Sequence, residues 1–227
     1  MEKKTTECYV ASLDLLGSSY TILHDKNDEH LNHVYNIYNS WKKIKSSGFY
    51  FKNLQIKFFS DNVVIAIDTS YGQSGLEFLI EFVTYITEHF LNCGYLIRGG
   101  ISKGQIYMDD LMVWGSGLVN AYILESKKAL YPRIIIAKEV VNEISQRTCD
   151  IMVLLDEDKQ YYLSYLRGYG KNAKSYLQII QKSLKMVDEQ SKTCDDDVKL
   201  KLNWFKKYLQ REQSHWTERE RMKKAWL

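Results

Sequence analysis

The chain has 227 residues, of which 45% are hydrophobic and 26% are charged, and its formal net charge at pH 7 is +3. This balance predicts a packed core and excludes a largely disordered chain. Because the basic residues are spread along the sequence, composition does not predict a nucleic-acid partner. No apolar run approaches the roughly 20 residues of a membrane span. With four cysteines that lack CxxC spacing, we expect a cytoplasmic protein with reduced thiols and no membrane partner.

The first part of the chain alternates between strand and helix patterns. The predicted elements are a strand at 9–13, a helix at 28–46, strands at 51–59 and 62–68, and a helix at 74–92. The polar tripeptide Ser60-Asp61-Asn62 separates two apolar runs, which is typical of a β-hairpin tip. Gly94 follows the helix at 74–92, where a C-cap glycine is expected.

The middle of the chain continues this alternation. The predicted elements are a strand or strand pair at 95–109, a helix at 117–128, a strand at 132–137 and a helix at 138–146. The order β-α-β-β-α-β-α-β predicts an α+β fold, a ferredoxin-like mixed sheet with helices on one face.

The C-terminal part has a different pattern. Residues 151–165 are strand-like, and residues 172–190 and 197–212 have a helical period. Asp195 to Asp197 are suited to capping the second of these helices, and 217–227 forms a charged final helix or a frayed end. We therefore expect one domain at 1–150 and a C-terminal strand and helical extension at 151–227 that packs on it.

Two aspartates stand at the ends of predicted strands. Asp14 follows the first strand, and Asp61 lies at the hairpin tip. If the two strand ends lie side by side, the carboxylates repel each other and call for a cation. Oxygen ligands without a neighbouring His or Cys favour Mg²⁺ or Mn²⁺. The structural alternative is that Asp14 caps a helix and Asp61 is an ordinary turn residue.

Two basic residues lie on the strands near these aspartates. Arg98 precedes a pair of glycines in "LIRGGISKG", and an arginine can fork onto phosphate oxygens where glycines let a backbone approach closely. Lys57 is four residues before Asp61, so the period of two places both on one face of the sheet. Alternatively, Arg98 is a surface residue on a kinked strand, and Lys57 extends to solvent.

Five segments resemble one enzyme family in their order along the chain. "LDLLGSS", "IKFFSDNVVIA", "LIRGGISKG", "VWGSGLVNAYILES" and "PRIIIAKEVV" resemble the motifs of a class III nucleotidyl cyclase domain over about residues 8 to 145. The details are most similar to the bacterial pyrimidine cyclases of Pycsar anti-phage systems. The resemblance implies that 1–150 is the catalytic domain.

The resemblance also implies roles for individual residues. Asp14 and Asp61 match the two metal-binding carboxylates, and the backbone carbonyl of Leu15 matches a third metal ligand. Arg98 matches an arginine that contacts the triphosphate, so Asp14, Asp61 and Arg98 are the expected catalytic set. Lys57 matches the lysine that meets the base in purine cyclases.

The base-reading part departs from the usual pattern. Met112 stands where a base-reading Asp is common, and Val119 and Ile123 occupy the usual Asn and Arg positions of the helix. Asn120 is one position off and is a candidate substrate contact. Tyr50 precedes the hairpin strand and is a candidate for contacting a smaller base. These departures are similar to those of pyrimidine cyclases.

The activity implied by the resemblance is conversion of UTP to cyclic UMP and pyrophosphate, with two Mn²⁺ or Mg²⁺ ions per site. A homodimer would share its two sites between subunits, and a separate effector protein would read the product in anti-phage defence. The alternatives are a cytidylate cyclase, an adenylate or guanylate cyclase of ordinary signalling type, and a non-catalytic nucleotide-binding dimerisation module.

Overall fold

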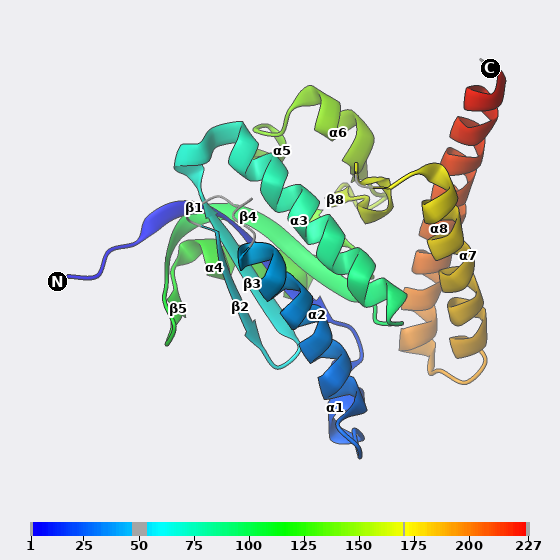
Figure 1. The fold of residues 1–227 in the computed structure, drawn as a ribbon, viewed down its shortest axis with the longest axis horizontal. Helices are drawn as coiled ribbons and strands as arrows, with labels where there is room; N and C mark the ends of the chain where they lie inside the picture. Colours follow the sequence, from blue (N-terminus) through cyan, green and yellow to red (C-terminus); the bar gives the residue numbers. More distant parts are fainter. Residues whose placement is uncertain (1, 47–53, 170, 226–227) are drawn as a thin grey trace.

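A mixed β-sheet forms the centre of the computed structural model, which describes residues 2–46, 54–169 and 171–225 (Figure 1). The strand order is β2-β3-β1-β4-β6-β8-β7, with β5 pairing with β4 beside this path. The strands are β1 (Thr6–Leu15), β2 (Gln55–Phe59), β3 (Asn62–Asp68), β4 (Ile97–Met108), β5 (Val113–Trp114), β6 (Ile134–Ile136), β7 (Val153–Leu155) and β8 (Tyr161–Leu163). The expected α+β architecture is confirmed.

The helices alternate with these strands along most of the chain. They are α1 (Ser18–Leu23), α2 (Glu29–Ser46), α3 (Gly72–Asn92), α4 (Ser116–Ile123), α5 (Lys138–Val141), α6 (Gln146–Met152), α7 (Ala173–Gln190) and α8 (Asp196–Ala225). Three shorter turns are η1 (Thr69–Tyr71), η2 (Leu124–Lys128) and η3 (Tyr165–Arg167), of which η2 is a π-helical turn.

Strand β1 is an interior strand of the sheet and is buried on both faces. It pairs antiparallel with β3 on one side and with β4 on the other, and β4 in turn pairs parallel with β6. Val10 and Ala11 have no exposed surface although they point to opposite faces. A near-continuous apolar strand of this kind is typical of a sheet that is covered on both sides.

Helices cover both faces of the sheet, which corrects the expectation of helices on one face. The larger core lies under α3, α7 and α8 and includes Ala11 and Ile65, while a smaller cluster of Val10, Val64 and Ala121 lies under α4. Helix α4 can approach the sheet closely because Gly104 has no side chain. A Cβ atom there would lie 2.8 Å from the backbone nitrogen of Gly117.

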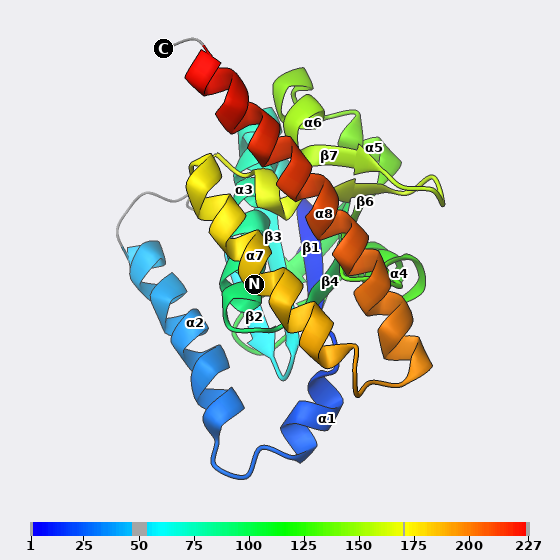
Figure 2. The same ribbon diagram turned by 90° about the vertical axis from the view of Figure 1, so that its right-hand side faces the viewer.

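The C-terminal helices α7 and α8 run side by side at one end of the sheet (Figures 1 and 2). Asp195 begins α8 by accepting a hydrogen bond from the Val198 backbone N–H (2.8 Å), as the sequence predicted. The chain then continues as one helix to Ala225, so the charged final segment is helical rather than frayed through that residue.

One local expectation was wrong, and one helix was missed. The predicted helix at 138–146 is only the short α5, because Ser145 accepts the backbone N–H of Thr148 (3.3 Å) and starts a second helix, α6. A serine at this position competes for backbone hydrogen bonds and favours a new helix start. The short α1 was not expected. Among the described helices, none has the length and hydrophobicity to cross a membrane.

Candidate active site

The ends of three neighbouring strands bring the predicted carboxylates together. The register places Asp14 of β1 opposite Asn62 of β3 and opposite Arg98 of β4. Asp61 immediately precedes Asn62 in the tight β2–β3 turn, which needs Ser60 at a positive φ of 53°. The Asp61 carbonyl accepts the Leu15 backbone N–H at 3.2 Å, so the turn is tied directly to the end of β1.

The two aspartates share one electrostatic environment. Burial raises the pKa of Asp14, the Arg98 guanidinium opposes this rise, and the neighbouring Asp61 carboxylate adds to it. Burial would also raise the pKa of Asp61, but hydrogen bonds led by the one from the Ser18 hydroxyl outweigh it and lower that pKa. Two adjacent carboxylates with opposite shifts are a common arrangement where a cation or a shared proton is held.

Arg98 neutralises part of this negative charge. Its Nε donates to Asp14 Oδ2 at 2.8 Å, and its Nη2 lies 3.1 Å from Glu125 Oε1. The Glu125 side chain is only 2% exposed, and burial raises its pKa to about 7 against the opposing effect of Arg98. Its second oxygen, Oε2, has no hydrogen-bond partner in the described part of the chain. Two carboxylates therefore hold the guanidinium, and a third, Asp61, lies next to Asp14.

The π-helical turn η2 delivers Glu125 to this position. The Ala129 backbone N–H bonds the Leu124 carbonyl at 2.8 Å, which closes the wider turn. The turn lies almost on the sheet, because a Cβ on Gly100 would be 2.3 Å from the Ala121 carbonyl oxygen and 3.0 Å from the Glu125 nitrogen. π-Turns of this kind are frequent at functional sites.

The residues at the strand ends fit a divalent cation. The donors are carboxylate oxygens, which Mg²⁺ and Mn²⁺ prefer, and the Asp14–Asp61 repulsion and the unpartnered Glu125 oxygen leave negative charge uncompensated. Within the described residues no group of three or more His, Cys, Asp or Glu side chains is arranged as a preformed metal centre. The aspartate pair would therefore need a further oxygen, for which the Leu15 carbonyl is the candidate.

The other predicted substrate contacts lie away from the aspartates. Lys57 Nζ donates to the Asp109 carbonyl at 2.6 Å and lines a cavity of about 670 Å³ between α2, β2 and the β4–β5 turn. Met112 is an exposed residue of that turn. Asn120 of α4 lines a separate cavity of about 420 Å³ beside α5 and the β7–β8 turn. Tyr50 is outside the described residues.

Two residues of the cluster were not assigned from the sequence. Glu125 belongs to the "LES" segment that carried the resemblance, and Ser18 belongs to "LGSS", but neither received a role. The signal for Glu125 was a carboxylate on a helix otherwise rich in apolar residues. Ser18 had no comparable signal, because a serine before a short helix is an ordinary cap residue.

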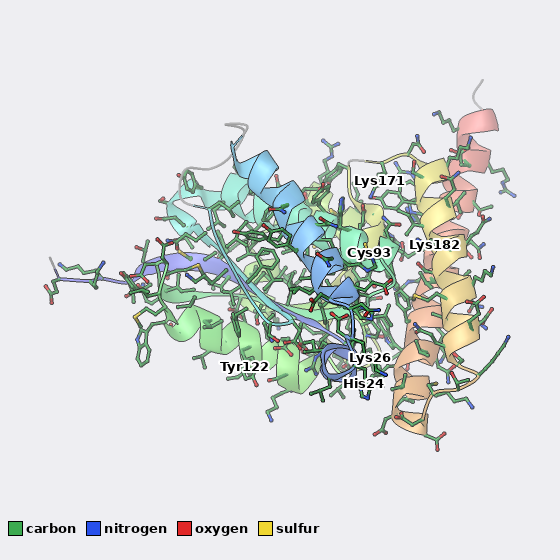
Figure 3. The ribbon with its side chains drawn as sticks, turned by 60° about the horizontal axis from the view of Figure 1, so that its bottom comes forward. His24, Lys26, Cys93, Tyr122, Lys171 and Lys182 are labelled. Atoms are coloured by element: carbon green, nitrogen blue, oxygen red, sulfur yellow. The ribbon has the colours of Figure 1, made fainter. Side chains whose placement is uncertain are left out.

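Helix α4 exposes an apolar row beside this cluster. Val119, Tyr122 and Ile123 are each about half exposed, and Trp114 of β5 is 68% exposed. Figure 3 shows Tyr122 pointing outward from α4. Large exposed apolar side chains that gather on one face are typical of an interaction surface.

Comparison with known proteins identifies the fold. No protein-family model matches the sequence, and no curated protein matches it either. Among solved structures, the adenylyl cyclase CyaB from P. aeruginosa is similar with a TM-score of 0.55 and 16% identity, covering 72% of this chain and 95% of that one.

A second similar structure is the monomeric guanylyl cyclase domain of the RhoGC fusion protein from the aquatic fungus Blastocladiella emersonii. Its TM-score is 0.51 at 15% identity, and the match covers 71% of this chain and 96% of that domain. The chain described here has the fold of a class III nucleotidyl cyclase domain, with a helical C-terminal part in addition.

Proposed function

We propose that the chain is a nucleotide cyclase that converts UTP to cyclic UMP and pyrophosphate. The observation that carries this proposal is the meeting of Asp14, Asp61 and Arg98 at the strand ends of a class III cyclase fold. We keep residues 1–150 as the proposed catalytic domain and 151–227 as its extension. The enzyme would work in the cytoplasm, and its product would be read by a separate effector protein.

Asp14, Asp61 and the Leu15 carbonyl would hold two Mn²⁺ or Mg²⁺ ions. When bound, such ions lower the pKa of an attacking hydroxyl and neutralise the charge of a triphosphate. The Ser18 hydroxyl and the Asn62 amide (3.2 Å) both donate to the Asp61 carboxylate. These donors keep the Asp61 carboxylate ionised and fixed in orientation, as a metal ligand requires.

In the proposed reaction the ribose 3′-oxygen forms a bond to the α-phosphorus while the bond to the pyrophosphate oxygen breaks. Positioning and charge stabilisation supply most of the rate enhancement in phosphoryl and nucleotidyl transfer. The Arg98 Nε would leave Asp14 and bind the phosphate oxygens, while the Arg98 Nη2 would keep its contact with Glu125. Glu125 is thus a positioning residue for the arginine.

Three residues support a pyrimidine rather than a purine substrate. Val119 and Ile123 replace the polar residues expected on α4, and Met112 replaces the expected acidic reader of a purine. The Lys57 ammonium already donates to a backbone carbonyl, which leaves it less available to read a purine base. These three residues do not distinguish UTP from CTP, so they support the alternative of a cytidylate cyclase equally well.

A homodimer would complete the site. The aspartates and Arg98 lie at one place, whereas Lys57, Met112 and Asn120 lie at others, which supports a site assembled from two subunits. The exposed apolar row of α4 supports a partner that covers it. Replacing Tyr122 by Asp would weaken the dimer, as light scattering after size exclusion would report, while the control change Leu200→Asp, at an exposed position on α8, would not.

The deciding experiment is to incubate the purified protein with Mn²⁺ and each of the four nucleoside triphosphates. We expect a cyclic product from UTP, a smaller amount from CTP and none from ATP or GTP, and no product in EDTA. A product from ATP or GTP alone would overturn the pyrimidine assignment. A folded protein that binds nucleotide but makes no product from any of the four would establish the non-catalytic alternative.

A further inference from the structure

A third cavity lies between α6 and the C-terminal helices α7 and α8. It has a volume of about 460 Å³ and is lined by α6, the end of η3, the start of α7 and the last turns of α8. These elements gather at the end of the molecule opposite α1 (Figure 2). In Figure 3, Lys171 at this cavity lies across the molecule from His24 and Lys26, which follow α1. The cavity is therefore separate from the aspartate cluster.

The wall of this cavity is strongly basic. It contains Arg147, Arg167, Lys171, Arg219 and Lys223 and one carboxylate, Glu220. Cationic side chains from several elements repel one another in a shared concave space, and an anion within that space removes the repulsion.

Two of these cations already have buried partners. Arg167 binds Glu212 through Nε at 2.6 Å and Nη2 at 3.1 Å, and the Glu212 side chain is fully buried. Lys171 is paired with the buried Glu88. These pairs fasten η3 and the start of α7 to α8 and α3, so they form the rigid floor of the cavity.

The other three cations have no carboxylate within ion-pair distance in the described ranges of the chain. Arg147 lies over the Tyr169 ring at 5.3 Å, and Arg219 lies over the Trp216 ring at 5.2 Å. Cation–π contacts of this kind fix the direction of a guanidinium and leave its N–H groups free to donate. Lys223 adds a third charge one helical turn beyond Arg219.

The start of α7 adds to the positive potential. Ala173, the first residue of this 18-residue helix, lines the cavity, and Asn172 caps the helix by accepting the Ser175 backbone N–H at 3.0 Å. The N-terminal end of a helix favours a negative charge nearby. The half-buried Glu81 lies behind Gly168 and is not part of the cavity wall.

We propose that this cavity binds a small molecule through a diphosphate or triphosphate group, held by Arg147, Arg219 and Lys223. Two guanidinium groups and an ammonium match the several oxygens of a condensed phosphate. The half-exposed Tyr169 ring at the rim is available to stack on a base if the phosphate belongs to a nucleotide. The site joins α6 to α8, so its ligand would stiffen the contact between the sheet and the C-terminal helices.

The test is calorimetric titration of the full chain in EDTA, first with inorganic pyrophosphate and then with UDP. We expect both to bind, with tighter binding of UDP if Tyr169 contacts a base and equal binding if only the phosphates are recognised. The changes Arg147→Gln and Arg219→Gln should each weaken binding about tenfold, the loss of one charge-assisted contact. The matched change Arg221→Gln, on another face of α8, should leave the affinity unchanged.

Lys223→Gln guards against variants that misfold, since this side chain is exposed on the last turns of α8. This change should also weaken binding. No heat of binding with millimolar pyrophosphate or UDP would overturn the proposal. The same is true if Arg98→Met abolishes binding while the three cavity changes do not, because the ligand would then sit at the aspartate cluster. This test requires no cyclase activity, so its result is independent of the proposed function.

Discussion

Two arginines in adjacent parts of the sheet each contact two carboxylates, but one arginine is partly exposed and the other is buried. Arg98 of β4 binds Asp14 and Glu125, and Arg133, just before β6, binds Asp156 and Asp158 in the β7–β8 turn. The Gly99 backbone N–H donates to the Arg133 carbonyl at 3.0 Å, so the two clusters are adjacent in the sheet.

The two clusters differ in exposure and in how completely their charges are paired. The Arg98 side chain is 27% exposed, and the Arg133 side chain is 0% exposed. Arg133 lies beside the stacked rings of Tyr131 and Trp204, at 5.3 and 5.8 Å from their centroids, and Trp204 Nε1 also donates to Asp156 at 2.9 Å. The Arg98 cluster instead holds a third carboxylate, Asp61, that the arginine does not neutralise.

The difference teaches that an arginine with two carboxylates is not in itself a functional signal. In a closed cluster every carboxylate contacts the arginine, and such a cluster holds elements together; here Trp204 of α8 also bonds its Asp156. An open cluster with surplus negative charge keeps room for a cation and an anionic substrate. The predictions below test this distinction.

The largest expected effect is the loss of activity when Asp61 becomes Asn. The change removes one proposed metal ligand, so the rate of cyclic product formation should fall by about 10²–10³-fold or more. Manganese binding, followed by electron paramagnetic resonance, should weaken in parallel. Adding Asp14→Asn should have little further effect on the rate, since both residues would hold the same ions. The control is Asp197→Asn, an exposed residue at the start of α8. An active Asp61→Asn enzyme would refute the proposed site.

The second prediction concerns stability rather than chemistry. Replacing Arg133 by Met leaves Asp156, whose side chain is only 16% exposed, without its counter-ion. Breaking a buried ion pair in this way costs about 3 kcal/mol. Urea unfolding should show the loss, while activity at a temperature where the variant is folded should stay near that of the wild type. Lys199→Met, on the exposed start of α8, is the control. Lost activity with unchanged stability would show that the closed cluster is also part of the active site.

The sequence predicted the central sheet because its strands carry strong patterns. The apolar runs around Asp14 and Asp61, the hairpin tip and the helix closed by Gly94 are local signals, and the structure has each of them. The prediction of one helix at 138–146 was wrong because Ser145 caps a new helix there. The apolar period continues through this position, so the sequence pattern does not show the break. The second helical layer was missed because the approach of α4 depends on Gly104 meeting Gly117, a contact between distant segments.

The sequence predicted only those site residues that become neighbours through the pairing of adjacent strands. Asp14 and Arg98 face each other across β1 and β4, and a family resemblance was enough to single them out. Glu125 reaches Arg98 through a π-turn, which no periodicity signals. The Arg133 cluster depends on Trp204, over 70 positions away in the chain, and nothing in the local pattern at Pro132-Arg133 indicates a buried charge.

A smaller effect is expected in the pH dependence of stability. Burial raises the pKa of Glu125 to about 7 from an ordinary 4.5, so between these values the folded chain binds more protons than the unfolded chain. The free energy of unfolding should therefore fall as the pH rises through this window, and the fall should be complete above about pH 7. Glu125→Gln should reduce this fall by about 1–3 kcal/mol, since one pKa unit corresponds to about 1.4 kcal/mol.

The measurement is urea unfolding at pH 5 and pH 8 in EDTA, for the wild type and for Glu125→Gln. His89 and His215, whose pKa values are lowered by burial, titrate in both proteins and cancel in the comparison. Equal falls in the two proteins would mean that the Arg98 guanidinium fully compensates the Glu125 charge. The open cluster would then be as completely paired as the closed one.

The smallest expected effect isolates one hydrogen bond of the closed cluster. Trp204→Phe keeps a ring that can stack on Tyr131, where the two rings now lie 5.6 Å apart and parallel within 1°, but it removes the N–H that Asp156 accepts. The free energy of unfolding should fall by about 1 kcal/mol, the usual contribution of one hydrogen bond. Trp114→Phe, at a side chain that is 68% exposed, should change it little. A loss at Trp204 as large as that of Arg133→Met would mean that ring packing, and not the paired charges, fastens α8 to the sheet.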